Sequence, residues 1–267
     1  MITRLLQQII ASGLGFFGLL VLILLALMTE IGFQIGRLQG RAARLHEKDA
    51  SGVSTLTSGI LGLVAFTLAV TIGIAQSRFE ARRQAILNEA NAIGSAWLRM
   101  GSAGPPGKPI AGLIEQYAHV RLAYLEAAKP KAVAAALVET NALQTDIWRR
   151  ASPVLAAMPS SLAAGLASSL NDMFGASLVE RYSRESGAPL ETMVGLLLGA
   201  MGAAGALGYQ MGLAGRRQLV LSLLLFLMMS GAMAMIIDFN RPQGGFIHTD
   251  PAPLIWTIEG FSPNAAS

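Results

Sequence analysis

The sequence contains no cysteine, which excludes disulfides, thiolate metal sites and cysteine nucleophiles and leaves the redox compartment undetermined. Charged residues are also scarce: they make up 13% of the 267 residues, against about 25% in soluble domains, while 53% of the residues are hydrophobic. This composition indicates a membrane protein. The formal net charge of +4 comes from basic residues spread along the chain without a block of like charges, so nothing indicates nucleic-acid binding.

Catalytic motifs are missing as well. The sequence has three isolated histidines and no metalloprotease, nucleophile-elbow or phosphate-loop motif. Gly199, Gly202 and Gly205 lie inside an apolar run, where they favour helix packing over nucleotide binding. His119 lies among apolar neighbours and is expected to be a partly buried structural residue. We therefore expect no enzyme and no cofactor or metal site.

Four apolar runs are long enough to cross a bilayer as helices. They cover residues 14–28, 54–77, 192–215 and 218–237. The first run follows Arg4 and could belong to a signal peptide, but it is too long for one and lacks a small-x-small cleavage site, so we predict a retained span. Glu30 and Arg37 follow it on one helix face, as an interfacial ion pair or as residues lining an ion entrance.

The segment from Ser54 to Met100 predicts a single helix that starts as the second span and continues into a soluble region. Further helices are predicted over residues 110–128 and 132–150 and from Ser160 onward, with no competing strand pattern. The predicted fold is all-α, with four transmembrane helices and a helical extramembrane domain inserted between the second and third spans.

The predicted domain boundaries follow from these runs. They are spans one and two with a short basic link (1–77), the helical domain continuous with the second span (78–187), spans three and four (188–238), and a C-terminal tail docked on the helical domain or on a neighbouring subunit (239–267). Four spans place both termini and the helical domain on one side of the membrane. Lysine and arginine residues in the short loops alone favour the two links as the inner side, whereas a count of all those near the membrane gives almost a tie. The positive-inside rule therefore does not decide the orientation.

One face of the second span combines threonines with aliphatic residues and ends in Arg78. Its candidate neck residues are Thr57, Ile60, Val64, Thr67 and Thr71. Such a stripe suits the wall of a narrow, weakly polar pore, and it equally suits close helix packing with hydroxyl groups bonding across. In the third span, glycines recur every three or four residues from Gly195 to Gly212, which predicts a close-packing ridge.

Polar residues gather where the second span ends and where the fourth span ends. The first group is Arg78, Glu80, Arg82, Arg83, Asn88, Glu89 and Asn91, for which we predict a polar cluster that fixes the angle of the helical domain. The second group is Asp238, Asn240, Arg241, Pro242 and Gly244, where we expect Asp238 to accept hydrogen bonds from a basic group such as Arg78 or Arg82, or to stay beside Arg241 at the helix end.

These motifs carry a resemblance to known membrane proteins. The run from Arg78 to Gly94, the turn from Gly208 to Arg217 and the tail from Asp238 to Gly245 are similar to the hallmarks of the bacterial bestrophin-like domain family. The order of two spans, a helical domain, two spans and a tail resembles that of the bestrophins. The resemblance covers nearly the whole chain.

The resemblance implies a homo-oligomeric, pentameric anion channel in the bacterial inner membrane, with cytoplasmic termini and helical domain. In bestrophins the second span supplies an apolar neck, which here would comprise the threonine and aliphatic stripe, with chloride or other anions as the permeant species. The acidic run of the eukaryotic calcium clasp is missing, so no calcium site is implied. The alternative is a non-conducting membrane protein whose helical domain binds a partner or acts as a sensory scaffold.

Overall fold

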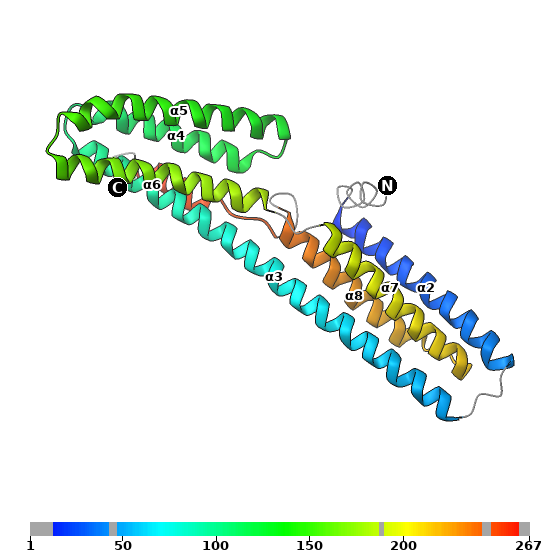
Figure 1. Ribbon diagram of the computed structural model, residues 1–267. Helices are drawn as coiled ribbons and strands as arrows, with labels where there is room; N and C mark the ends of the chain where they lie inside the picture. The colour runs from blue at the N-terminus through cyan, green and yellow to red at the C-terminus, as the bar shows by residue number, and fades with distance from the viewer. Residues whose placement is uncertain (1–12, 43–46, 187–189, 242–246, 262–267) are drawn as a thin grey trace. The chain divides into compact units, whose positions relative to one another are not determined.

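The computed structural model describes residues 13–42, 47–186, 190–241 and 247–261, and in this part of the chain the secondary structure is helical throughout (Figure 1). The helices are α2 Leu14–Ala42, α3 Glu47–Ser102, α4 Lys108–Glu126, α5 Pro130–Ala156, α6 Ser160–Glu185, α7 Leu190–Ala214, α8 Leu219–Asn240 and α9 Ala252–Glu259. Four of them, α2, α3, α7 and α8, are long and apolar enough to cross a membrane. The predicted fold class is therefore confirmed.

The chain divides into two compact units. The membrane unit comprises residues 1–77, 187–241 and 245–247, and the helical unit comprises residues 78–186, 242–244 and 248–267. Helix α3 contributes to both, because the division falls between Ser77 and Arg78 in the middle of this 56-residue helix. Each unit has its own packing, which is described separately.

In the membrane unit, helices α2 and α7 approach so closely that their backbones touch (Figure 1). A Cβ atom added to Gly208 would lie 2.0 Å from the carbonyl oxygen of Thr29, and one added to Gly32 would lie 2.0 Å from that of Gly205. The Thr29 hydroxyl donates a hydrogen bond to the Ala204 carbonyl, 3.1 Å away. Only glycine allows this separation, so these positions determine how α2 and α7 pack.

The glycine ridge predicted for the third span thus packs against α2 over only part of its length. Gly208 and Gly212 contact the α2 backbone, whereas nothing lies within 4 Å of a Cβ placed on Gly195 or Gly202. The α2 side of the contact comes from Gly32 and Gly36, which the sequence analysis had assigned to no interface.

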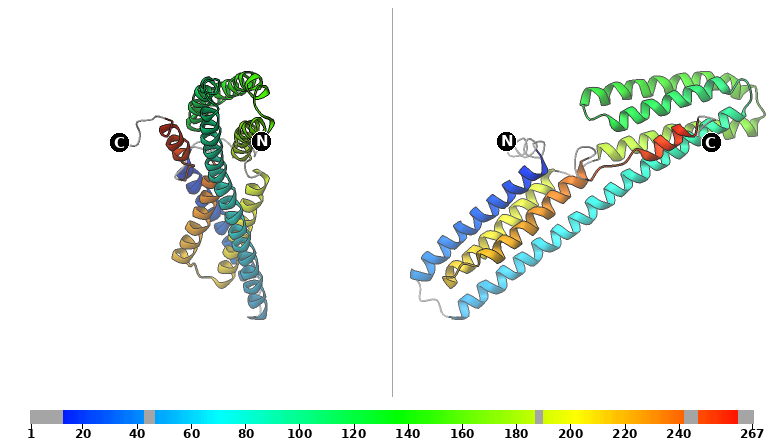
Figure 2. Two further views of the ribbon diagram at one scale, coloured as in Figure 1. Left: turned by 90° about the vertical axis from the view of Figure 1, so that its left-hand side faces the viewer. Right: turned by 180° about the vertical axis from the view of Figure 1, so that it is seen from behind.

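The helical unit has a core built from α3, α4, α5, α6 and α9. Ile93 and Met100 of α3, Ile114 of α4 and Met173 of α6 are fully buried. The tail enters this core as well: Leu254 is buried, and the Phe261 ring stacks on Trp97 with centroids 4.8 Å apart. Figure 2 shows α9 beside the C-terminal part of α3.

Helix boundaries differ from the predicted ones at prolines and at the basic link. Helix α5 begins at Pro130, because proline in the first turn lacks only an N–H that would have no helical partner. It also continues past Pro153 to Ala156, since a proline so close to the end removes little of the hydrogen-bond ladder. At the basic link between the first two spans, α2 extends to Ala42 and α3 begins at Glu47.

Candidate functional site

The structure divides the candidate neck stripe of α3 between two environments. Thr57, Val64 and Thr71 are buried against the other spans of the same chain; Val64 lies near Gly199 of α7, where 3.7 Å separates its side chain from a Cβ built on that glycine. Ile60 and Thr67, in contrast, are exposed in the single chain. These three residues of α3 are seven positions apart and therefore form one helix face that packs inside the membrane unit. The adjacent face is available to another subunit, to lipid or to a pore.

The exposed face of α3 is strongly apolar. Ile60 is 40% exposed, and Leu63, Phe66 and Ile74 lie on the same open side with exposures of 66%, 67% and 50%. In a membrane-spanning helix such side chains cost nothing when they face lipid, and they also suit a subunit interface or a dry constriction.

The polar residues for which a cluster is predicted after the second span lie in different environments. Glu80 forms an exposed ion pair with Arg83 at 3.2 Å, and Asn88 accepts a hydrogen bond from Gln84 at 2.9 Å. Asn91 is exposed, Arg78 is half-buried and Arg82 is buried. Glu89 points to the other side of α3, into the core of the helical unit, because it lies on the same helix face as Ile86 and Ile93.

Glu89 belongs to a buried ionic triad with Arg121 of α4 and Glu180 of α6. The guanidinium of Arg121 donates through Nε and Nη2 to the two carboxylate oxygens of Glu89, and Nη2 also donates to Glu180 at 2.8 Å. All three side chains are at most 3% exposed. The triad links three helices through charged hydrogen bonds and, with both carboxylates ionised, carries one net negative charge.

The surroundings of the triad shift the titration of its members. Burial raises the pKa of Glu180 to about 7; Arg121 opposes this and the neighbouring Glu89 carboxylate adds to it. Burial acts to lower the pKa of Arg121, yet the carboxylate of Glu89 outweighs it and the pKa lies above its ordinary value. Burial also raises the pKa of Tyr117, whose hydroxyl accepts a hydrogen bond from Gln144 at 3.1 Å. Burial therefore brings the pKa of Glu180 close to neutral pH.

Arg121 and Glu180 were not predicted from the sequence. Arg121 occupies a core position of α4, since it follows Ile114 and Tyr117 at helical spacing and precedes Tyr124. A charged residue in the middle of an apolar face is a signal for a buried ion pair, although the pattern does not reveal the partners. The expectation for His119 was wrong: it lies on the exposed side of α4.

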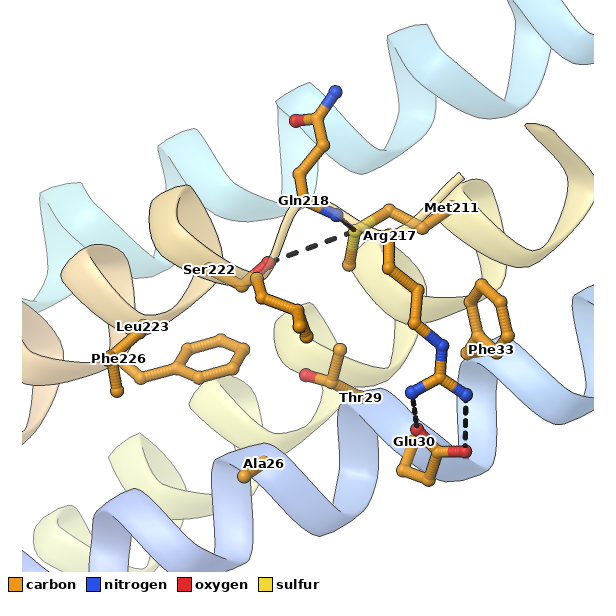
Figure 3. Close-up of a pocket in the computed structure, with 11 residues that line it drawn as sticks. Ala26, Thr29, Glu30, Phe33, Met211, Arg217, Gln218, Ser222, Leu223 and Phe226 are labelled. Carbon is orange, nitrogen blue, oxygen red and sulfur yellow. Dashed lines mark hydrogen bonds and ion pairs between the residues drawn. The ribbon is translucent and has the colours of Figure 1, made fainter. Parts of the chain in front are cut away.

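At the end of the membrane unit, Glu30 of α2 pairs with Arg217 at the start of the chain leading into α8 (Figure 3). Two guanidinium nitrogens donate to the two carboxylate oxygens at 2.9 and 3.0 Å, and Gln34 donates to the same carboxylate at 2.7 Å. The Arg217 guanidinium also lies 4.2 Å from the centre of the Phe33 ring. The local Glu30–Arg37 pair expected from the sequence is replaced by this long-range pair, because the α7–α8 link brings Arg217 to the α2 face.

The tail motif is only partly described. The Asp238 side chain is buried and accepts a hydrogen bond from the Ile247 backbone N–H at 3.0 Å, while Asn240 donates to the Ile236 carbonyl at 2.7 Å. Pro242 and Gly244 lie outside the described residues. Asp238 therefore connects the end of α8 to the chain at Ile247.

Comparison with solved structures gives independent support for the fold. Neither a protein-family profile nor a curated protein matches this sequence. Among solved structures, one described as a membrane protein superposes with a TM-score of 0.69 and 13% identity over 94% of this chain and 99% of that chain. A bacterial bestrophin homolog from Klebsiella pneumoniae superposes with a TM-score of 0.66 and 14% identity, over 90% of this chain and 96% of its own.

The chain has a bestrophin-like fold. A mutant of the Klebsiella homolog superposes equally well, with a TM-score of 0.66 and 13% identity over 90% of this chain and 96% of that chain. At such low identity the similarity establishes the bestrophin-like fold alone. Within the described residues, no group of three or more histidine, cysteine, aspartate or glutamate side chains could hold a metal ion.

Proposed function

We propose that this protein is a homo-oligomeric, pentameric anion channel whose neck is formed by α3. The observation that carries the proposal is the bestrophin-like fold across 90% of the chain. The resemblance to bestrophins implies an anion channel whose second span lines the pore. The exposed apolar face of α3 supports it, because this face lacks a partner among the described residues of its own chain and has the character that a neck requires.

The neck is assigned to α3 residues according to their environment. Ile60 and Thr67 face the pore axis in the proposed oligomer, where an apolar constriction would restrict flow by dewetting. Thr57, Val64 and Thr71 hold α3 against the other spans and thereby set the position of the neck. Arg78 and Arg82 raise the local anion concentration at the inner mouth, because a ring of arginines from several subunits focuses a positive potential.

Anion flux into liposomes that contain the purified protein tests the proposal. We expect chloride flux above that of protein-free liposomes and a higher flux for Ile60→Ala, because a smaller side chain widens and wets the constriction. Leu227→Ala is the matched control, since Leu227 is an exposed leucine of α8 with a 52% exposed side chain outside the proposed neck. Its flux should equal that of the unmodified protein.

Absence of anion flux would contradict the proposal. If the unmodified protein, Ile60→Ala and Val64→Ala all remain silent while the protein is folded and oriented in the liposomes, the channel proposal is wrong. A non-conducting membrane protein with a partner-binding helical unit would then be the better interpretation. Arg78→Gln adds a second measurement: it should reduce the preference for chloride over potassium in a salt-dependent manner.

A further inference from the structure

An apolar cavity lies between α2 and α8 at the end of the membrane unit that carries the α7–α8 link (Figure 3). Its volume is about 350 Å³, and Ala26, Leu219, Leu223 and Phe226 provide most of its apolar wall. Ala26, Leu219 and Leu223 are exposed, so the cavity opens on the outer surface of the helices, where lipid chains lie. The bidentate pair of Glu30 and Arg217 forms its polar end.

A second, polar cavity of about 490 Å³ adjoins the first and shares Phe33 and Arg217 with it. Arg37 projects into this second cavity, beside Gly40 and Gly215. Arg217 uses two of its five N–H groups on Glu30, which leaves three for another acceptor. Arg37 forms no ion pair or hydrogen bond with any side chain that the structure describes, so its full donor set is available.

The apolar cavity and the polar cavity together suit an amphiphilic molecule with an acyl chain and a phosphate. An apolar chamber open to the bilayer accepts an acyl chain, and two arginines at its polar end suit a phosphate, because guanidinium groups bind phosphate oxygens in a bidentate manner. The charge of Glu30 is neutralised by Arg217, so Arg37 and the neighbouring Arg216 leave this end positive. A zwitterionic lipid would place its own cation there and lose that attraction.

We propose that this pair of cavities is a binding site for an anionic phospholipid of the adjacent leaflet. One acyl chain lies between α2 and α8 against Leu223 and Phe226, and the phosphate is held by Arg37 and by the remaining N–H groups of Arg217. Glu30 orients the Arg217 guanidinium through its two hydrogen bonds and Phe33 covers its face. This inference concerns the lipid-facing side of the bundle and does not depend on ion conduction.

Native mass spectrometry of the detergent-purified protein, titrated with phosphatidylglycerol or phosphatidylcholine of identical chains, tests the proposal. We expect phosphatidylglycerol to bind at least about tenfold more tightly, because phosphatidylcholine would place its choline cation close to the arginines. Arg37→Gln should abolish this preference and leave the lipid-free melting temperature unchanged, because Arg37 is exposed. Arg149→Gln, which removes a 75% exposed arginine from the helical unit, is the charge-matched control and should bind like the unmodified protein.

A second variant examines the apolar half of the site. Ala26→Leu extends an exposed side chain into the cavity and should weaken phosphatidylglycerol binding while Arg37 and Arg217 remain in place. Equal binding of the two lipids, or an unchanged preference in Arg37→Gln, would overturn the proposal. If inorganic phosphate competes as well as phosphatidylglycerol, or Ala26→Leu has no effect, the site binds a free anion and the lipid assignment fails.

Discussion

Arg121 is the residue on which the packing of the helical unit depends most directly, since it donates to carboxylates from two other helices. Transfer of three charged groups out of water carries a large desolvation cost, which only their mutual attraction and hydrogen bonds offset. The triad therefore contributes specificity of helix pairing more than net stability. The removal of one partner should lower stability strongly, because the remaining charges are then buried without a counter-charge.

Truncation of Arg121 should destabilise the helical unit strongly. Arg121→Met leaves Glu89 and Glu180 buried together without a cation, and we expect a loss of about 3–5 kcal/mol in thermal or denaturant unfolding. Arg83→Ala breaks an ion pair whose side chains are 58% and 63% exposed, and its loss should be about 0–1 kcal/mol. Equal effects of the two variants would show that the triad is solvated.

Glu180 should make the stability of the protein depend on pH. Its pKa rises from an ordinary 4.5 to about 7 on folding, so between these values the folded state keeps a proton that the unfolded state has released. Its contribution to stability therefore falls as pH increases from 4.5 to about 7 and is constant above that. The difference in unfolding free energy between Glu180→Gln and the unmodified protein should follow this curve, and a pH-independent difference would contradict the assignment.

At the scale of elements, the α2–α7 contact determines the arrangement of the membrane unit. The interface depends on glycines whose Cβ positions are already occupied by backbone atoms of the facing helix. A methyl group at such a position forces the helices apart, and neither backbone can rotate away as a side chain would.

Gly208→Ala should accordingly lower the melting temperature of the detergent-purified protein by several degrees, because the new Cβ would lie 2.0 Å from the Thr29 carbonyl oxygen. Gly195→Ala on the same helix is the control: nothing lies within 4 Å of its Cβ, and alanine is the better helix former, so stability should be unchanged or slightly higher. A similar loss in both variants would indicate that helix propensity or subunit contacts, not the α2 contact, govern α7.

The tail element α9 offers a comparable test in the helical unit. Leu254→Ala removes a side chain that is 1% exposed and should cost about 2–5 kcal/mol in the free energy of unfolding. Trp256→Ala, on the outer side of the same helix with 66% exposure, should cost no more than about 0.5 kcal/mol. Hydrogen exchange provides the measurement: backbone amides of α4 should lose protection in the first variant and keep it in the second.

At the scale of the whole molecule, the sequence was most informative where a single local property decides the structure. The absence of charge over about twenty residues is enough to predict a membrane-spanning helix, and all four predicted spans are present. The uninterrupted helix through Gly94 was predictable from helix propensity, because no proline lies between Gly73 and Met100. Local helix propensity and hydrophobicity are sufficient to predict the four spans and the continuous helix α3.

What the sequence did not reveal depends on partners far apart along the chain. Glu30 was expected to meet Arg37 seven residues away, yet its partner is Arg217, 187 residues away. Glu89 was grouped with its sequence neighbours, whereas the structure pairs it with Arg121 of α4, which also binds Glu180 of α6. Helical spacing shows which residues share a face, but the element opposite that face follows only from the tertiary fold.

The close contact of α2 with α7 also sets an order of events during synthesis. The bonded residues Thr29 and Ala204 are separated by 175 positions, so at about 5–20 residues per second roughly 10–35 s pass before α2 meets its partner. The core of the helical unit is completed later still, because Leu254 and Phe261 belong to it and follow Ala204 in the chain. Neither unit of the nascent chain can therefore complete its packing before these later segments are made, and until α7 is made the glycine face of α2 is open to the translocon, to lipid and to chaperones.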